Sequence, residues 1–134
     1  MQEIAKNWKD YECIDAGDGY KLERWKDVIL SRPESHADWS KNPKVKEWKE
    51  VHAHYHLNND KGDWQIKQTL PETWNIQYKD LTFKVSPTSF KHTGLFPEQA
   101  ANWDWMRKLI EQEEREIRVL NLFAYTGGAT MACS

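Results

Sequence analysis

Residues 119–134 read Val-Leu-Asn-Leu-Phe-Ala-Tyr-Thr-Gly-Gly-Ala-Thr-Met-Ala-Cys-Ser, and they indicate the class of the fold more clearly than any other segment. The almost continuous apolar run from Val119 to Phe123 is typical of a strand that is covered on both faces. Gly127 and Gly128 allow a sharp turn and a close approach to a ligand, because they carry no Cβ. The small residues that follow suit the start of a helix, which Thr126 could cap. The segment therefore predicts a buried strand, a glycine turn and the first turns of a helix.

A strand that leads through glycines into a helix is where nucleotide-like ligands bind in doubly wound folds, because free N–H groups and the helix dipole meet anionic groups there. The turn is not a phosphate-binding P-loop, since no Gly-Lys-Ser/Thr sequence follows it. It is not the dinucleotide fingerprint either, since Phe123 and Tyr125 stand where the first glycines would be. An ordinary structural turn is the alternative. Because a buried strand needs parallel neighbours and covering helices, we expect this chain to be the N-terminal part of a longer protein.

The composition is that of a folded domain of ordinary size. The chain has 134 residues, and its eight Trp, five Tyr and four Phe supply core material that disordered segments lack. With a net charge of −2, the chain is not strongly basic, so we expect it to bind nucleic acid only weakly where the binding is non-specific. Cys13 and Cys133 lie too far apart in sequence to indicate a metal pair or a disulfide framework. The sequence shows no signal peptide and no apolar run of membrane-spanning length, so we expect a cytoplasmic protein that does not enter membranes.

Residues 1–86 read as a small β-rich domain. Alternation of apolar and polar residues predicts strands at 11–15, 20–25, 28–32, 64–67, 74–78 and 81–85. A short helix is predicted over 44–55. The last two strands form a predicted hairpin, whose core candidates are Trp74, Ile76, Tyr78, Leu81, Phe83 and Val85.

Residues 87–116 are expected to link this domain to the C-terminal segment. Thr93 and Gly94 mark a turn, and Pro97 is well placed as a first helical residue. A helix over 97–114 would carry one apolar stripe formed by Ala100, Trp103, Met106 and Leu109 or Ile110.

Two polar segments admit both a functional and a structural interpretation. One interleaves cations with aromatic rings, a combination that can hold single-stranded nucleic acid: Lys41, Lys44, Lys46 and Lys49 with Trp39 and Trp48. A solvated face is the favoured interpretation, because the net charge is not basic. The other segment holds His52, His54 and His56, which on a strand would share one face and could approach zinc. No further ligand lies nearby in sequence, so we expect no metal site.

Residues 121–128, Asn-Leu-Phe-Ala-Tyr-Thr-Gly-Gly, resemble motif I of class I S-adenosylmethionine (SAM)-dependent methyltransferases, in the form used by RNA cytosine carbon-5 methyltransferases. Residues 90–99, Phe-Lys-His-Thr-Gly-Leu-Phe-Pro-Glu-Gln, are similar to the Thr-Gly-x-x-x-Asp-Gln-Arg segment that precedes motif I in that clade. The match is closest to a bacterial subgroup related to enzymes that modify large-subunit ribosomal RNA. The chain departs from the pattern at Asn121, where many methyltransferases have an acidic residue, and at Ala100, where the arginine is absent.

The resemblance implies an α+β fold, with an antiparallel β-rich N-terminal domain followed by the first strand and helix start of a Rossmann-like methyltransferase domain over 117–134. It implies SAM as the cofactor, RNA as the partner of the whole protein, and ten cofactor-binding residues: Thr93, Gly94, Gln99, Asn121, Phe123, Ala124, Tyr125, Thr126, Gly127 and Gly128. Neither Cys13 nor Cys133 matches the catalytic cysteine of the cytosine enzymes. The catalytic residues are therefore expected beyond Ser134, and the chain alone is expected to be inactive.

Two function classes follow. In the first, the chain is the N-terminal part of a SAM-dependent methyltransferase with its first cofactor-binding motif. In the second, it is a non-catalytic interaction module whose glycine turn is structural. In either class, two alternatives stay open for residues 117–134: the segment is disordered in this chain, or it pairs with another copy through its apolar strand and forms a homodimer.

Overall fold

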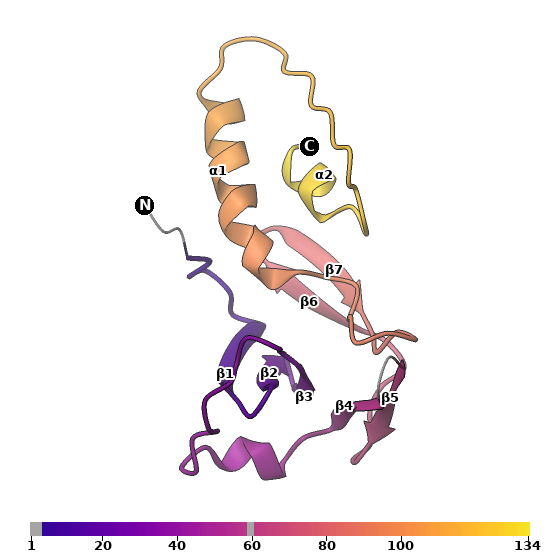
Figure 1. Ribbon diagram of the computed structural model, residues 1–134. Helices are drawn as coiled ribbons and strands as arrows, with labels where there is room; N and C mark the ends of the chain where they lie inside the picture. Colours follow the sequence, from indigo (N-terminus) through magenta and orange to yellow (C-terminus); the bar gives the residue numbers. More distant parts are fainter. Residues whose placement is uncertain (1–3, 59–60) are drawn as a thin grey trace.

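The computed structural model describes residues 4–58 and 61–134, which form two sheets and two α-helices (Figure 1). The larger sheet has the order β1-β2-β3-β4-β5, with β1 (Tyr11–Gly17), β2 (Tyr20–Trp25), β3 (Val28–Pro33), β4 (Ala53–Asn58) and β5 (Lys61–Ile66). The second sheet is the hairpin of β6 (Trp74–Tyr78) and β7 (Leu81–Val85), and the helices are α1 (Ala100–Glu111) and α2 (Gly128–Ala132). Figure 1 shows the five-stranded sheet at the lower end of the molecule and the hairpin, α1 and α2 above it. Within the described ranges, the helices lack the length and apolar character that a membrane span needs.

Strands β1, β2 and β3 form an antiparallel meander that the sequence predicts. Gly17 pairs with Tyr20 and Trp25 pairs with Val28, so each connection has two residues. Asp18 and Gly19 have φ angles of 50° and 77°, the left-handed conformation that matches a two-residue hairpin turn to the twist of its strands. The predicted strands at 11–15, 20–25 and 28–32 are confirmed.

The connection from β3 to β4 differs from the prediction in two ways. The helix predicted over 44–55 is wrong, because only Lys46–Lys49 form a 3-10 helix and β4 begins at Ala53. Val51, Ala53 and Tyr55 are buried in alternation, which is the period of a strand and not of a helix. β4 also runs parallel to β3, with Leu30 opposite Ala53, so the sheet is not wholly antiparallel as predicted.

The hairpin of β6 and β7 packs against α1 and connects both parts of the molecule through one core. Five of its six predicted core side chains are buried, and the sixth, Trp74, is half-buried. Trp74 donates from Nε1 to the carbonyl oxygen of Trp25 at 3.1 Å, which joins the hairpin to β2. The core continues from Trp25 and Leu30 in the larger sheet through Tyr78 to Trp103 in α1. The boundary at residue 86 between the predicted domains stays a prediction.

Helix α1 follows a 3-10 turn at Pro97–Gln99 and ends at Glu111, three residues before the predicted end. Ala100 and Trp103 are buried as predicted, whereas Leu109 is 45% exposed. Arg107 joins α1 to its neighbours, since its guanidinium pairs with Asp80 in the β6–β7 turn and donates to the carbonyl oxygen of Ala132 at 2.9 Å.

The strand predicted at 119–123 is not formed, whereas the helix start that follows it is present as α2. A β-strand requires hydrogen bonds to a neighbouring strand. The described strands all pair with one another within the two sheets at residues 11–85, so residues 119–123 pair with none of them. The segment instead runs as coil beside α2 (Figure 1), where Asn121 donates to the Thr130 hydroxyl. Its apolar side chains are therefore exposed, with Leu120 at 81% and Phe123 at 91%.

Candidate functional site

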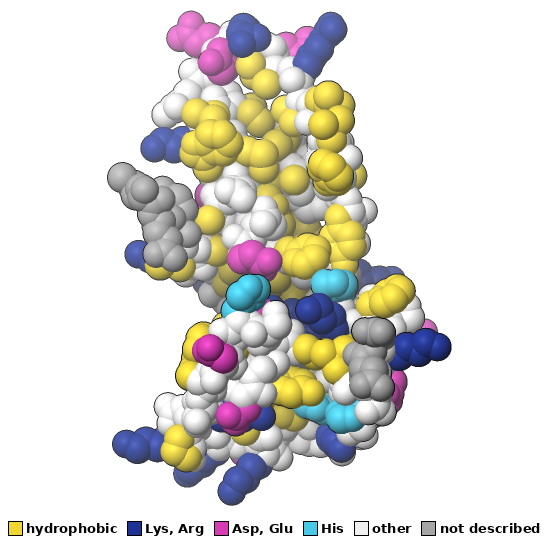
Figure 2. Space-filling model, viewed as in Figure 1, with side chains coloured by type: hydrophobic (Ala, Val, Ile, Leu, Met, Phe, Trp, Pro, Cys, Tyr) yellow, Lys and Arg dark blue, Asp and Glu magenta, His cyan; other side chains and the backbone are white. Residues whose placement is uncertain are grey.

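A cavity of about 530 Å³ lies between the start of α1 and the turn that precedes α2. Its lining is mostly apolar with a few polar groups, and consists of Leu95, Phe96, Glu98, Gln99, Trp103, Phe123, Ala124, Tyr125, Thr126, Gly128 and Ala129. Figure 2 shows that hydrophobic side chains gather on the part of the molecule that holds α1 and α2. Cavities of this size, with apolar walls and few polar groups, are typical of small-molecule sites.

The turn before α2 has a backbone that only certain residues adopt easily. Gly127 has a φ of 92° and Tyr125 a φ of 49°, and the Gly127 N–H donates to the Ala124 carbonyl oxygen at 2.7 Å. Gly128 lies against Trp103, because a Cβ at residue 128 would stand 3.0 Å from the indole. The two glycines therefore serve different needs: Gly127 allows the left-handed conformation and Gly128 allows close packing on α1.

Thr126 does not cap α2 as predicted. Its hydroxyl donates to the carbonyl oxygen of Gly94 at 2.6 Å, and α2 has no side-chain cap at its first residue. This bond joins the glycine turn to the loop at 86–96, so the two conspicuous segments of the sequence contact each other directly. Phe96 and Tyr125 continue the contact, with ring centroids 5.2 Å apart.

The loop at 86–96 is held in place by the five-stranded sheet. Trp64 in β5 donates from Nε1 to the carbonyl oxygens of Thr88 and Phe90, at 2.9 and 3.0 Å. Arg32 in β3 donates to the carbonyl oxygen of Lys91 at 3.0 Å. The N-terminal sheet therefore positions one wall of the cavity through backbone contacts.

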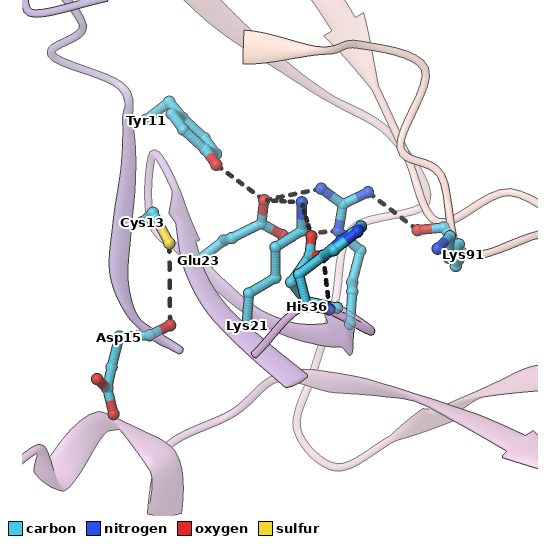
Figure 3. A network of polar contacts seen from close by, with 9 residues as sticks. Tyr11, Cys13, Asp15, Lys21, Glu23, His36 and Lys91 are labelled. Carbon is cyan, nitrogen blue, oxygen red and sulfur yellow. Dashed lines mark hydrogen bonds and ion pairs between the residues drawn. The ribbon is translucent and has the colours of Figure 1, made fainter. Parts of the chain in front are cut away.

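Arg32 is itself fixed by a buried ion pair, which Figure 3 shows with its neighbours. The guanidinium donates to both carboxylate oxygens of Glu23, at 2.6 and 2.7 Å, and the Tyr11 hydroxyl donates to the same carboxylate at 2.8 Å. Burial alone would raise the pKa of Glu23, but the hydrogen bonds and charge of Arg32 outweigh it and hold that pKa below its usual value. Burial and the Glu23 carboxylate raise the pKa of Tyr11, so its hydroxyl stays protonated as a donor.

The structure brings six of the ten predicted site residues to the cavity: Gln99, Phe123, Ala124, Tyr125, Thr126 and Gly128. The other four do not line it. Thr93 is buried, Gly94 accepts the bond from Thr126, and Gly127 shapes the turn. Asn121 donates from Nδ2 to the Thr130 hydroxyl at 2.9 Å and so braces the start of α2.

Five lining residues were not among the ten predicted site residues: Leu95, Phe96, Glu98, Trp103 and Ala129. Leu95, Phe96 and Glu98 lie inside the conspicuous segment at 90–99, so their neighbourhood was a usable signal. Trp103 was assigned to helix packing, which is correct, yet its indole also faces the cavity. Among the described lining residues, Glu98 carries the one charge, so the site offers a carboxylate to a cationic or hydroxyl group.

The histidine segment has structural contacts. His52 accepts from the Ile29 N–H at 3.1 Å through Nδ1, and the Nδ1 of His54 lies 3.1 Å from the Ser31 hydroxyl. Over residues 4–58 and 61–134, no three side chains of the metal-binding types cluster, and the absence of a metal stays a prediction. Neither cysteine lines the cavity: Cys13 is exposed on β1, and Cys133 contacts Met106 through sulfur at 3.8 Å.

Two solved structures resemble this chain. Over 94% of its length, the chain superposes on a SAM-dependent methyltransferase from Agrobacterium tumefaciens, with a TM-score of 0.87 and 35% identity. The chain is similar to SAM-dependent methyltransferases. A protein from Streptococcus mutans described as a putative SAM-dependent methyltransferase has the same fold, with 18% identity, 96% of this chain covered and a TM-score of 0.59.

Part of the chain is also similar to a protein known from its sequence. The chain is 49% identical over 56 residues, or 42% of its length, to the ribosomal RNA large subunit methyltransferase K/L of Magnetococcus marinus. No family model matches the chain. The chain spans 7% of the Magnetococcus protein, 41% of the Agrobacterium protein and 36% of the Streptococcus protein. The two structural neighbours are described as a SAM-dependent methyltransferase and a putative one.

Proposed function

We propose that this chain is the N-terminal part of a SAM-dependent methyltransferase that acts on RNA, and that the cavity at the glycine turn holds part of SAM. One observation carries the proposal. The segments at 90–99 and 121–128, which resemble methyltransferase motifs and are distant in sequence, supply the two facing walls of one cavity. The similarity to the Agrobacterium enzyme supports the same cofactor.

The residues present fit the chemistry of SAM. SAM supplies a reactive methyl group on a sulfonium, so the protein has to bind it, orient it and exclude water. The N–H groups of Gly128 and Ala129 belong to the first turn of α2, where a helix offers them no internal acceptor, and they would receive the carboxylate of the methionine portion. The Gly127 N–H already donates to Ala124, so it braces the turn.

The opposite wall would bind the remaining polar groups. Glu98 offers a carboxylate to the ammonium group of the methionine portion, and Gln99 offers an amide with both donor and acceptor atoms. Phe96, Tyr125 and Trp103 present apolar surface that would exclude water from the ligand.

The substrate part of the proposal is RNA, with carbon 5 of cytosine in ribosomal RNA as the preferred target. The Magnetococcus relative supports ribosomal RNA, and the motif resemblance at 121–128 supports cytosine. Nucleoside analysis of RNA treated with the whole protein and SAM tests this part. We expect 5-methylcytidine, and a different methylated nucleoside would contradict the choice of base.

The methyl-transfer residues are proposed to lie outside these 134 residues, in a protein that acts in the cytoplasm. Two observations support this placement: the structural neighbours are more than twice as long as the stretch this chain covers, and neither cysteine lines the cavity. Methyl transfer to RNA by the isolated chain would contradict it.

The central experiment is calorimetric titration of S-adenosylhomocysteine, the demethylated product of SAM, into the whole protein and its Gly127→Val variant. Valine is strained at a φ of 92°, so the turn should change shape and binding should be lost, while the open space around this position spares the rest of the fold.

Gly19→Val is the matched control. Gly19 also has a left-handed φ, 77°, and open space around it, but it lies in the β1–β2 turn and outside the cavity. We expect this control to bind S-adenosylhomocysteine like the native protein. Equal affinity of the native protein and Gly127→Val would contradict the cofactor site and favour the interaction module.

A further inference from the structure

A second hollow, of about 400 Å³, lies in the five-stranded sheet and has a different character from the first. Three lysines line it, and the lining includes no carboxylate: Ser31, Lys41, Trp48, Lys49, Val51, His54, Lys67 and Gln68. This local excess of positive charge occurs in a chain whose net charge is −2. Figure 2 shows several Lys and Arg side chains around the end of the molecule that the five-stranded sheet forms.

Within the described part of the chain, no salt bridge involves Lys41, Lys49 or Lys67. Burial raises the pKa of Asp15, but hydrogen bonds from Trp48 and the backbone, together with the charge of Lys41, hold it below its usual value, so Lys41 and Asp15 attract each other. The Lys41 Nζ lies over two aromatic faces, 4.3 Å from the centroid of Trp48 and 5.3 Å from that of Tyr20. A cation held on aromatic rings keeps its charge available to an anion.

The carboxylate beside the hollow is already occupied. Asp15 accepts from the Trp48 indole at 2.7 Å and from the Asn42 N–H at 3.0 Å. These bonds hold Trp48 and the lysine-bearing connection against β1. Asp15 therefore lies outside the lining of the hollow and supports Trp48, which does line it.

The floor of the hollow shows the same positive field. Ser31 is buried, and its hydroxyl lies 3.1 Å from the Nδ1 of His54. The pKa of His54 is lowered, first by burial and then by the charges of His56, Lys41 and Lys67. Burial disfavours a charge of either sign, so only the smaller contributions from His56, Lys41 and Lys67 reflect positive charge around the hollow.

We propose that this hollow, here called the lysine hollow, binds a phosphodiester group of the RNA substrate through Lys41, Lys49 and Lys67. The choice of RNA as the source of the phosphate rests on the proposed function. The geometry adds a spatial consequence, since the 3-10 helix that carries Trp48 and Lys49 lies at the end of the molecule remote from α1 and α2 (Figure 1). An RNA bound there and reaching the cavity at the glycine turn would extend along the length of the chain.

The test is a fluorescence anisotropy titration of a labelled single-stranded RNA with the 134-residue chain, without SAM, at several salt concentrations. The variant Lys41→Gln/Lys49→Gln/Lys67→Gln should weaken binding on the order of ten-fold or more. It should also flatten the dependence of log affinity on log salt by about 2, since each phosphate contact on a single strand contributes about 0.7. The matched control, Lys44→Gln/Lys46→Gln/Lys84→Gln, removes the same charge from exposed lysines outside the hollow.

A control that weakens binding as much as the hollow variant would overturn the inference, and so would a native chain without measurable affinity for RNA. The Trp48 indole N–H, assigned with Trp48→Phe, gives a second readout by NMR. Its chemical shift should change at an RNA concentration far below the concentration of inorganic phosphate that produces the same change. Equal potency of phosphate and RNA would overturn the assignment to RNA.

The outcome also separates the two proposals. The chain could bind RNA through the three lysines while the whole protein shows no affinity for S-adenosylhomocysteine. That result would support the lysine hollow and contradict the proposed methyltransferase function. The reverse result would remove the lysine hollow alone.

Discussion

The Glu23–Arg32 pair is the residue-scale feature on which the position of the cavity wall depends. Glu23 is fully buried and Arg32 is 5% exposed, so both charges are removed from water. Such pairs add little net stability, because the desolvation cost offsets the attraction, but removing one partner leaves an uncompensated charge. Here the pair also fixes where Arg32 donates, which is the Lys91 carbonyl oxygen in the loop at 86–96.

We predict that Glu23→Gln lowers the free energy of unfolding by about 3–5 kcal/mol, because Arg32 would stay buried without a counter-charge. Urea denaturation followed by circular dichroism measures the change. The double variant Glu23→Leu/Arg32→Leu should be closer to the native chain in stability, since it removes both charges together. A single variant as stable as the native chain would show that water reaches the pair.

At the scale of elements, the candidate site depends on the loop at 86–96 and the glycine turn before α2, which one side-chain hydrogen bond joins. The Thr126 hydroxyl donates to the Gly94 carbonyl oxygen at 2.6 Å, while the rest of the loop is held by Trp64 and Arg32. The loop thus has support from the five-stranded sheet on one side and contact with the glycine turn on the other. Loss of the Thr126 bond should affect ligand binding more than folding.

We predict that Thr126→Val in the whole protein weakens binding of S-adenosylhomocysteine about five- to ten-fold, the worth of one hydrogen bond of about 1 kcal/mol. Valine keeps the shape of threonine, so the melting temperature should change little. Thr82→Val, at an exposed position of β7, is the control and should leave the affinity unchanged. A drop in melting temperature without a change in affinity would show that the bond serves folding alone.

Elements with a clear local pattern were predictable, and those that depend on distant partners were not. The alternation at 74–78 and 81–85 indicates the hairpin because both strands find each other across a two-residue turn. The segment at 44–55 resembles a helix locally, but pairing with β3 and β5 makes its end a strand. Residues 119–123 have the apolar pattern of a buried strand. They form no strand here because no neighbouring strand among the described residues pairs with them.

The same distinction applies to the site. Ala124, Thr126 and Gly128 were expected from the resemblance at 121–128, and all three line the cavity. Trp103 was not expected there, because its exposure to the cavity is created where α1 meets Gly128 in space. The lysine-rich segment was weighed on the net charge, and neither its meeting with Lys67 nor the hydrogen bonds of Asp15 could be seen in the sequence.

The whole molecule combines one continuous core with one uncovered apolar segment. The core joins both sheets and α1, whereas Leu120, Leu122 and Phe123 are each at least 75% exposed. Neighbouring exposed apolar side chains mark a surface that another protein surface covers.

We predict that the 134-residue chain self-associates through residues 119–123 as its concentration rises, because contact between two copies would remove this apolar surface from water. Sedimentation velocity over a concentration series measures the association. Leu122→Glu should shift the chain toward the monomer, while Leu57→Glu, at an exposed leucine of β4, should not. A native chain that stays monomeric at all concentrations would contradict the predicted homodimer.

Trp103 has a final consequence for how the molecule can be observed. Its indole forms part of the cavity surface, and its ring stands close to Gly128 and 5.2 Å from Phe83. A molecule that enters the cavity displaces water beside an emitting ring, so the colour and intensity of its fluorescence depend on occupancy. Trp103 fluorescence would therefore report whether the cavity is occupied, and subtraction of the Trp103→Phe spectrum would isolate its signal from that of the other tryptophans.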